Sequence, residues 1–145
     1  MPEKETLERA EEDKKEGKAP STQAGEFVRE EIEHVREGKH GARSTKQAIA
    51  IGLSKARRAG VKLQPPKKGS KQTRKQAARD LKKGKKQSAK KSAKRSRATS
   101  RALKREGHSA ASKRALSRQA RSAAKKRSAA SRSRSAKKAA KTRKK

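Results

Sequence analysis

The sequence contains no cysteine, no tryptophan and no tyrosine, and it has a single phenylalanine in 145 residues. The lack of cysteine excludes disulfides, thiolate zinc sites and a cysteine nucleophile. Large apolar side chains are also scarce, because leucine, isoleucine, valine and phenylalanine together number 13. So few of them cannot offset about 1–2 kcal/mol of conformational entropy for every ordered residue of the chain. A large packed domain is therefore excluded, and we expect at most one small core.

Long apolar segments are missing as well. The longest run of apolar residues and glycine extends from Ala48 to Leu53, far short of the roughly 20 residues of a membrane-spanning helix. The first residues mix acids and bases and lack the apolar segment of a secretory signal. We therefore expect an intracellular protein with no membrane partner.

Positive charge is in large excess, with 47 Lys and Arg against 14 Asp and Glu and a formal net charge of +33. Residues 1–64 contain 14 basic and 12 acidic side chains, whereas residues 65–145 contain 33 basic and 2 acidic ones. The second part is rich in lysine, arginine, alanine and serine, a composition typical of chains that stay disordered or fold on binding. The sequence therefore predicts a small helical head at 1–64 and a low-complexity cationic tail at 65–145.

Helical patterns occur three times in the head. The segment 3–16 has a weak apolar face and predicts a short, frayed helix. Apolar residues recur at helical spacing in 21–38 and again in 44–60. Ser44 and Gln47 match a capping box at the start of the last segment, and Val61, just after Gly60, is expected to fold back on its final turn.

The predicted fold class is all-α. It consists of a small N-terminal helical hairpin, with two to three short helices, followed by a long basic tail that is largely disordered or conditionally helical. Alanine favours helix, so binding to phosphates, which neutralises the self-repulsion of the tail, is expected to promote helix formation. We interpret the many serines of the tail as small soluble spacers, and alternatively as phosphorylation sites that would lower its charge.

The segment KQAIAIGLSKARRAG, from Lys46 to Gly60, resembles the core of a bacterial family of small basic proteins of unknown function. The resemblance extends to Gly25–Ser44 and to the RALKREGHSAAS stretch at Arg101–Ser112. It implies DNA binding and a bacterial origin, and it implies no catalytic residue. In composition, the tail also resembles the Lys- and Ala-rich tails of linker histones and bacterial histone-like proteins.

Binding to nucleic acid is the function that this charge favours, because each phosphate met by Lys or Arg releases condensed counterions. The tail has no aromatic side chain on which bases could stack, so binding is expected to be independent of sequence. Duplex DNA is the favoured partner, and the protein is expected to be nucleoid-associated in the bacterial cytoplasm. The predicted phosphate-binding residues are Lys46, Lys55, Arg57, Arg58, Lys67, Lys68, Lys82, Lys83, Lys85, Lys86, Lys90, Lys91, Lys94, Arg95, Arg97, Arg101, Lys104, Arg105, Lys113, Arg114, Arg118, Arg121, Lys125, Lys126, Arg127, Arg132, Arg134, Lys137 and Lys138.

Several alternatives stay open. The hairpin is either a helix-turn-helix DNA reader, with Lys46, Lys55, Arg57 and Arg58 on phosphates, or a structural or oligomerising unit. RNA or the ribosome is an alternative partner, because charge does not distinguish one polyanion from another. A third interpretation is an interaction protein whose acidic head modulates its own basic tail.

Catalytic and cofactor-binding patterns are missing. His34, His40 and His108 do not form a HExxH or His-x3-His spacing, so we predict no metal site. The glycines form neither a GxxxxGK(S/T) loop nor a GxGxxG loop, so we predict no nucleotide cofactor and no small-molecule substrate. The sequence does not predict an enzyme.

Overall fold

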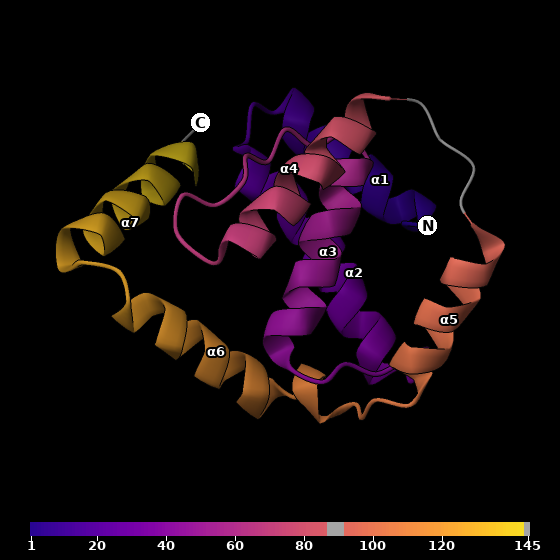
Figure 1. Ribbon diagram of the computed structural model, residues 1–145. Coiled ribbons are helices and arrows are strands. Elements are labelled where there is room, and N and C mark those ends of the chain that lie inside the picture. The colour runs from indigo at the N-terminus through magenta and orange to yellow at the C-terminus, as the bar shows by residue number, and fades with distance from the viewer. Residues whose placement is uncertain (87–91, 144–145) are drawn as a thin grey trace.

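The computed structural model describes residues 1–86 and 92–143. In these ranges the regular secondary structure is helix, and loops connect the helices (Figure 1). The elements are α1 (Lys4–Lys15), α2 (Pro20–Arg36), α3 (Thr45–Arg58), α4 (Lys71–Lys85), α5 (Ala93–Lys104), the 3-10 helix η1 (Ser109–Ala111), α6 (Lys113–Lys125) and α7 (Ala129–Arg143). None of the helices in the described ranges is both long enough and apolar enough to cross a membrane. The all-α class is therefore confirmed.

The three helices predicted in the head are present as α1, α2 and α3. Helix α2 begins at Pro20, one residue before the predicted start at Ser21, and Pro20 follows an extended Ala19. Proline suits the first turn of a helix, because the N–H that it lacks would have no partner within the helix there. Helix α1 packs on α2, so the fraying expected for 3–16 is opposed by tertiary contact.

The first turn of α3 has the predicted serine cap. Ser44 Oγ accepts a hydrogen bond from the Gln47 backbone N–H at 3.2 Å. The Gln47 side-chain Oε1 in turn accepts a hydrogen bond from the backbone N–H of Arg43, at 2.7 Å, rather than from that of Ser44. The capping box thus holds α3 to the preceding loop, one residue earlier than in the standard motif.

Helix α3 ends at Gly60, which has a φ of +102°. The Val61 N–H donates to the Ala56 carbonyl at 3.1 Å, and the Gly60 N–H donates to that of Arg57 at 3.2 Å, which is the bonding of a Schellman motif. Val61 is buried against the last turn, as predicted. It joins Ala10, Ala24, Phe27 and Ala56 in a first apolar cluster between α1, α2 and α3.

A second apolar cluster lies at the other end of the α2–α3 pair, so residues 1–86 and 92–143 form two clusters, whereas at most one small core was expected. From the head it contains Ile32, Val35, Ala42 and Ala48. From the tail it contains Ala110 and Ala111, which are buried, and Leu116, which packs against it. The tail therefore contributes part of the core beneath α2 and α3.

The prediction of a largely disordered or conditionally helical tail is wrong, because the described part of the tail folds into α4, α5, η1, α6 and α7. Alanine is the strongest helix former, and the serines interpreted as spacers cap these helices. Ser70, Ser92, Ser112 and Ser128 each accept a hydrogen bond from the backbone N–H three residues later. The prediction failed because the high charge and the scarcity of large apolar residues were taken as sufficient for disorder, and because the serines were not recognised as helix caps.

Helix α4 packs on α3. Ala77 and Asp80 are its buried residues, and Asp80 accepts hydrogen bonds from Ser54 Oγ at 2.7 Å and from Arg58 Nε at 2.9 Å. Gly84 lies against the backbone of Arg57 so closely that a Cβ there would overlap the Arg57 carbonyl oxygen. Contacts thus cross the predicted boundary at residue 64.

The turn between α5 and α6 is bound to the loop between α2 and α3. Backbone N–H groups of Gly41 and Ala42 donate to the carbonyls of Leu103 at 2.9 Å and Gly107 at 3.0 Å. Thr45 Oγ donates to the Ala110 carbonyl at 2.6 Å. Helices α5 and α6 leave this turn in opposite directions, on two sides of the bundle (Figure 1).

Candidate nucleic-acid interface

Helix α3 supplies four of the predicted phosphate-binding residues. Three of them already bind carboxylates or carbonyls of the protein itself. Lys55 Nζ is 2.7 Å from Glu31 Oε2 and 3.2 Å from Glu30 Oε1. Burial lowers the pKa of Lys55, but the two negatively charged carboxylates beside it outweigh this effect and raise the pKa above its ordinary value. Lys55 is thus a half-buried charged residue whose partners lie within the protein.

The two arginines at the end of α3 also have internal partners. Arg57 is 7% exposed and donates from Nε to the Leu63 carbonyl at 3.0 Å. Arg58 is more exposed but binds Asp80 through Nε and Nη2. Of the four residues on α3, Lys46 is exposed and takes part in none of the ion pairs in the described ranges.

The predicted cations of the tail that the structure describes are all exposed. Lys67 and Lys68 precede α4, and Lys82, Lys83, Lys85 and Lys86 lie at its end. Helix α5 and its C-cap present Lys94, Arg95, Arg97, Arg101, Lys104 and Arg105; α6 and the residues just after it present Lys113, Arg114, Arg118, Arg121, Lys125, Lys126 and Arg127; and α7 presents Arg132, Arg134, Lys137 and Lys138. Lys90 and Lys91 lie outside the described residues.

Helix α6 gathers its cations into one stripe, which we call the α6 stripe: Arg114, Arg118, Arg121 and Lys125. Their spacing of four, three and four residues places them on one face, and they line a shallow open groove together with Ser117, Ser122 and Lys126. No carboxylate pairs with these four residues in the described part of the chain. At 1.5 Å per residue the stripe is about 16 Å long.

The opposite face of α6 determines where the stripe points. Leu116 lies about half a helical turn away from the stripe and packs against the second apolar cluster. Ser112 caps the helix, with its Oγ 3.2 Å from the Ala115 N–H. The stripe is therefore turned away from the head. Like charges at i,i+3 and i,i+4 cost about 0.2–0.5 kcal/mol per pair, a cost that a bound polyanion would relieve.

Helix α5 has a shorter stripe of the same kind. Lys94, Arg97 and Arg101 line a second shallow surface with Ala98. Helices α5 and α6 lie on two sides of the bundle (Figure 1), so the two stripes belong to helices that are apart from each other. All of these cations are among the predicted phosphate-binding residues, and their helical spacing, a signal that could have identified the stripes, is present in the sequence.

The two acidic residues of the tail, whose role the sequence did not indicate, both pair with the head. Asp80 is 1% exposed and binds Arg58, and Glu106 lies 3.6 Å from Arg43. Both tail carboxylates therefore bind arginines of the head. Among the ion pairs of the described residues, no head carboxylate pairs with a tail cation.

Residues 4–68 match the model of a family described as "Family of unknown function (DUF6496)". The match includes α1, α2, α3 and the Lys46–Gly60 segment, and it ends before α4. This agrees with the resemblance to an uncharacterised family. No curated protein matches the chain significantly. No solved structure matches it significantly either.

Proposed function

We propose that this protein binds duplex DNA without reading its sequence and acts as a nucleoid-associated protein in a bacterial cytoplasm. The observation that supports the proposal best is the α6 stripe, Arg114, Arg118, Arg121 and Lys125, which lies on one open helical face with no carboxylate paired to it in the described residues. The resemblance of Lys46–Gly60 to a bacterial family supports the proposed origin.

Counterion release supplies the binding free energy. Duplex DNA has a negative charge about every 1.7 Å along its axis, so a cationic stripe about 16 Å long meets several phosphates. Arginine binds phosphate oxygens with two parallel N–H groups. The tail has no aromatic residue on which bases could stack, and its arginines and lysines bind the phosphates of any sequence, so the proposed contacts are with the DNA backbone rather than with particular bases.

The shape of the stripe favours DNA over duplex RNA. An α-helix with its side chains is about 10–12 Å wide and fits the major groove of B-form DNA, which is about 12 Å wide. The major groove of A-form RNA is deep and narrow, so the same helix would reach only its outer phosphates. RNA or the ribosome stays the alternative partner, and duplex RNA is therefore the comparison ligand in the test below.

The separate stripes of α5 and α6 also favour bridging over simple coating. Each stripe belongs to a helix on its own side of the bundle (Figure 1), and α5 ends and α6 begins at the turn that the head holds through Gly41, Ala42 and Thr45. Two DNA segments would then be bound on two sides of one small bundle. The further alternative, an acidic head that modulates the tail, gains no support from the ion pairs of the described residues, where tail cations contact no head carboxylate.

The experiment compares two triple variants in the full chain. Arg114, Arg118 and Arg121 are changed to Gln in one, and the exposed arginines of α7, Arg132, Arg134 and Arg143, are changed to Gln in the other. Binding to mixed-sequence duplex DNA is measured by fluorescence anisotropy over a salt series. Each lost phosphate contact lowers the slope of log K against log salt by about 0.9, so the α6 variant should lose about 2.7.

The α7 variant is the matched control, because it removes the same number of arginines from a helix on which they do not form one stripe. We expect it to lose clearly less slope and less affinity. Equal losses in the two variants would show that the tail binds as a diffuse polycation, and the role of the stripe would be refuted. Tighter binding to duplex RNA than to duplex DNA would favour the RNA alternative.

A further inference from the structure

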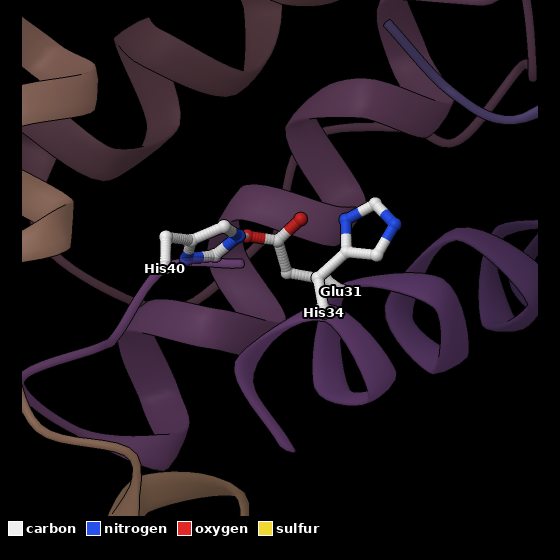
Figure 2. A group of neighbouring side chains, drawn as sticks. All are labelled: Glu31, His34 and His40. Atoms are coloured by element: carbon white, nitrogen blue, oxygen red, sulfur yellow. Dashed lines mark ion pairs between the residues drawn. The ribbon is translucent and has the colours of Figure 1, made fainter. Parts of the chain in front are cut away.

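Two histidines and a glutamate meet on the head. Glu31 and His34 lie one helical turn apart on α2, and His40 lies in the loop after it (Figure 2). One ligand atom from each residue lies within 4.8 Å of the other two. The Glu31 side chain is 1% exposed, and those of His34 and His40 are 13% and 17% exposed.

Hydrogen bonds orient both imidazole rings. Nδ1 of His40 is 2.9 Å from the Gly41 carbonyl oxygen, and Nε2 of His34 is 2.8 Å from Glu3 Oε1. Each partner is an acceptor, so the ring nitrogen facing it carries the proton. A neutral imidazole has one proton, so a lone pair is left on Nε2 of His40 and on Nδ1 of His34. These are the nitrogens on the Glu31 side of the rings (Figure 2).

The carboxylate of Glu31 lies between the two imidazole rings (Figure 2), and neither of its buried oxygens has a hydrogen-bond partner among the described residues. Lys55 Nζ is 2.7 Å from Oε2, but the angles of this contact are not those of a hydrogen bond, and the ammonium is shared with Glu30. Oε1 faces Nε2 of His40 at 3.1 Å. With a neutral ring, two acceptors face each other there, an unfavourable contact that either a proton on Nε2 of His40 or a metal ion between the two atoms would relieve.

We propose that Glu31, His34 and His40 bind a divalent zinc ion. Two imidazoles and one carboxylate form a ligand set typical of zinc sites with an open fourth position, whereas magnesium and calcium prefer oxygen ligands. Two atoms about 2.1 Å from a tetrahedral zinc are about 3.4 Å apart, close to the 3.1 Å between Glu31 Oε1 and His40 Nε2. The outer hydrogen bonds to Gly41 and Glu3 match those that hold metal-binding histidines in place.

The charges around the site allow a cation. Besides Glu31, the carboxylates of Glu3 and Glu30 lie nearby, and the cations among them are Lys39 and Lys55. Lys55 keeps Glu30 as a partner when Glu31 turns to the metal. The site joins α2 to the loop whose backbone binds the turn between α5 and α6. Zinc is therefore expected to stabilise the docking of the tail, and the proposal does not rest on DNA binding.

The test uses the full chain without a purification tag. After chelation, zinc is titrated against the protein and two variants, His34→Asn and His40→Asn, with His108→Asn as the control because His108 is exposed and outside the group. We expect one zinc per chain for the parent and for His108→Asn. The other two variants should bind zinc at least about tenfold more weakly. Unchanged binding in both would overturn the proposal.

A second measurement on the unaltered chain covers the case in which a variant does not fold. Zinc should shift the imidazole ¹⁵N resonances of His34 Nδ1 and His40 Nε2 and leave those of His108 in place. The visible spectrum of the cobalt-loaded protein should show the bands of a tetrahedral site. The proposal is refuted by the lack of stoichiometric zinc, or by shifts confined to His108.

Discussion

Replacing Gly52 with alanine tests the crossing of α2 and α3, on which both apolar clusters depend. A Cβ at Gly52 would lie 2.6 Å from the Val28 Cα and 3.0 Å from the Phe27 carbonyl oxygen. These are backbone atoms, so no side-chain rotation relieves the overlap, and the helices have to separate by several tenths of an ångström or more. Overpacking of this kind costs about 1–3 kcal/mol, and a backbone clash belongs at the upper end.

The gain in helix propensity opposes this cost. Alanine is better than glycine in a helix interior by about 1 kcal/mol, so the Gly52→Ala chain should be less stable than the parent by about 2 kcal/mol. Gly25 offers the matched control, because it also lies within a helix and nothing lies within 4 Å of its Cβ position. Gly25→Ala should therefore raise the stability by about 0.5–1 kcal/mol.

Urea unfolding followed by far-UV circular dichroism measures both changes, and it suits a chain that has neither tryptophan nor tyrosine for fluorescence. The two substitutions are chemically identical, so only their surroundings differ. If Gly52→Ala stabilised the protein as Gly25→Ala does, α2 and α3 would not touch at Gly52 and the packing described above would be incorrect.

Two further predictions concern the tail. Asp80→Asn removes the charge that binds Arg58 and should destabilise the docking of α4 by about 1–3 kcal/mol, less than a fully buried pair because Arg58 is half-exposed; hydrogen exchange should show lost protection in 71–85. Glu106→Gln removes the charge that lies 3.6 Å from the exposed Arg43 and should change the stability by less than about 1 kcal/mol. If Asp80→Asn and Glu106→Gln changed the stability equally, burial of Asp80 would not strengthen its ion pair. Ser112→Ala removes the cap of α6 and should cost about 1 kcal/mol, seen as weaker helical NMR shifts in 113–117. Ser117→Ala, within α6, should leave that helix intact, and a loss of helix there instead would refute the cap.

Much of the head could be predicted because its signals are local. The serine cap at Ser44, the glycine stop at Gly60 and the return of Val61 each depend on a few neighbouring residues, and all three are present. Local signals were also available in the tail, where Ser70, Ser92, Ser112 and Ser128 begin helices. They were misread because the high charge was taken as sufficient for disorder.

The candidate interface could be predicted only as a list of cations. Their number and their placement at steps of three and four residues are in the sequence, but which face of α6 meets solvent depends on the contact of Leu116 with the second apolar cluster. Lys55, Arg57 and Arg58 were indistinguishable in the sequence from the cations of α6. Their carboxylate and carbonyl partners, up to 25 residues away along the chain, became known only from the fold.

Composition and local patterns by themselves determined the net charge, the lack of cysteine chemistry, the all-α class and the ends of the head helices, because these depend on residue type or on neighbours within one turn. The tertiary structure alone decided that Ala110 and Ala111 are core residues, that Asp80 is buried, and that Glu31, His34 and His40 meet. Alanine is common throughout the tail, and no pattern marks the two that are buried. The reason is physical: burial and ion pairing are properties of residues brought together by packing, and the free energy of such contacts depends on their surroundings rather than on the segment that contains them.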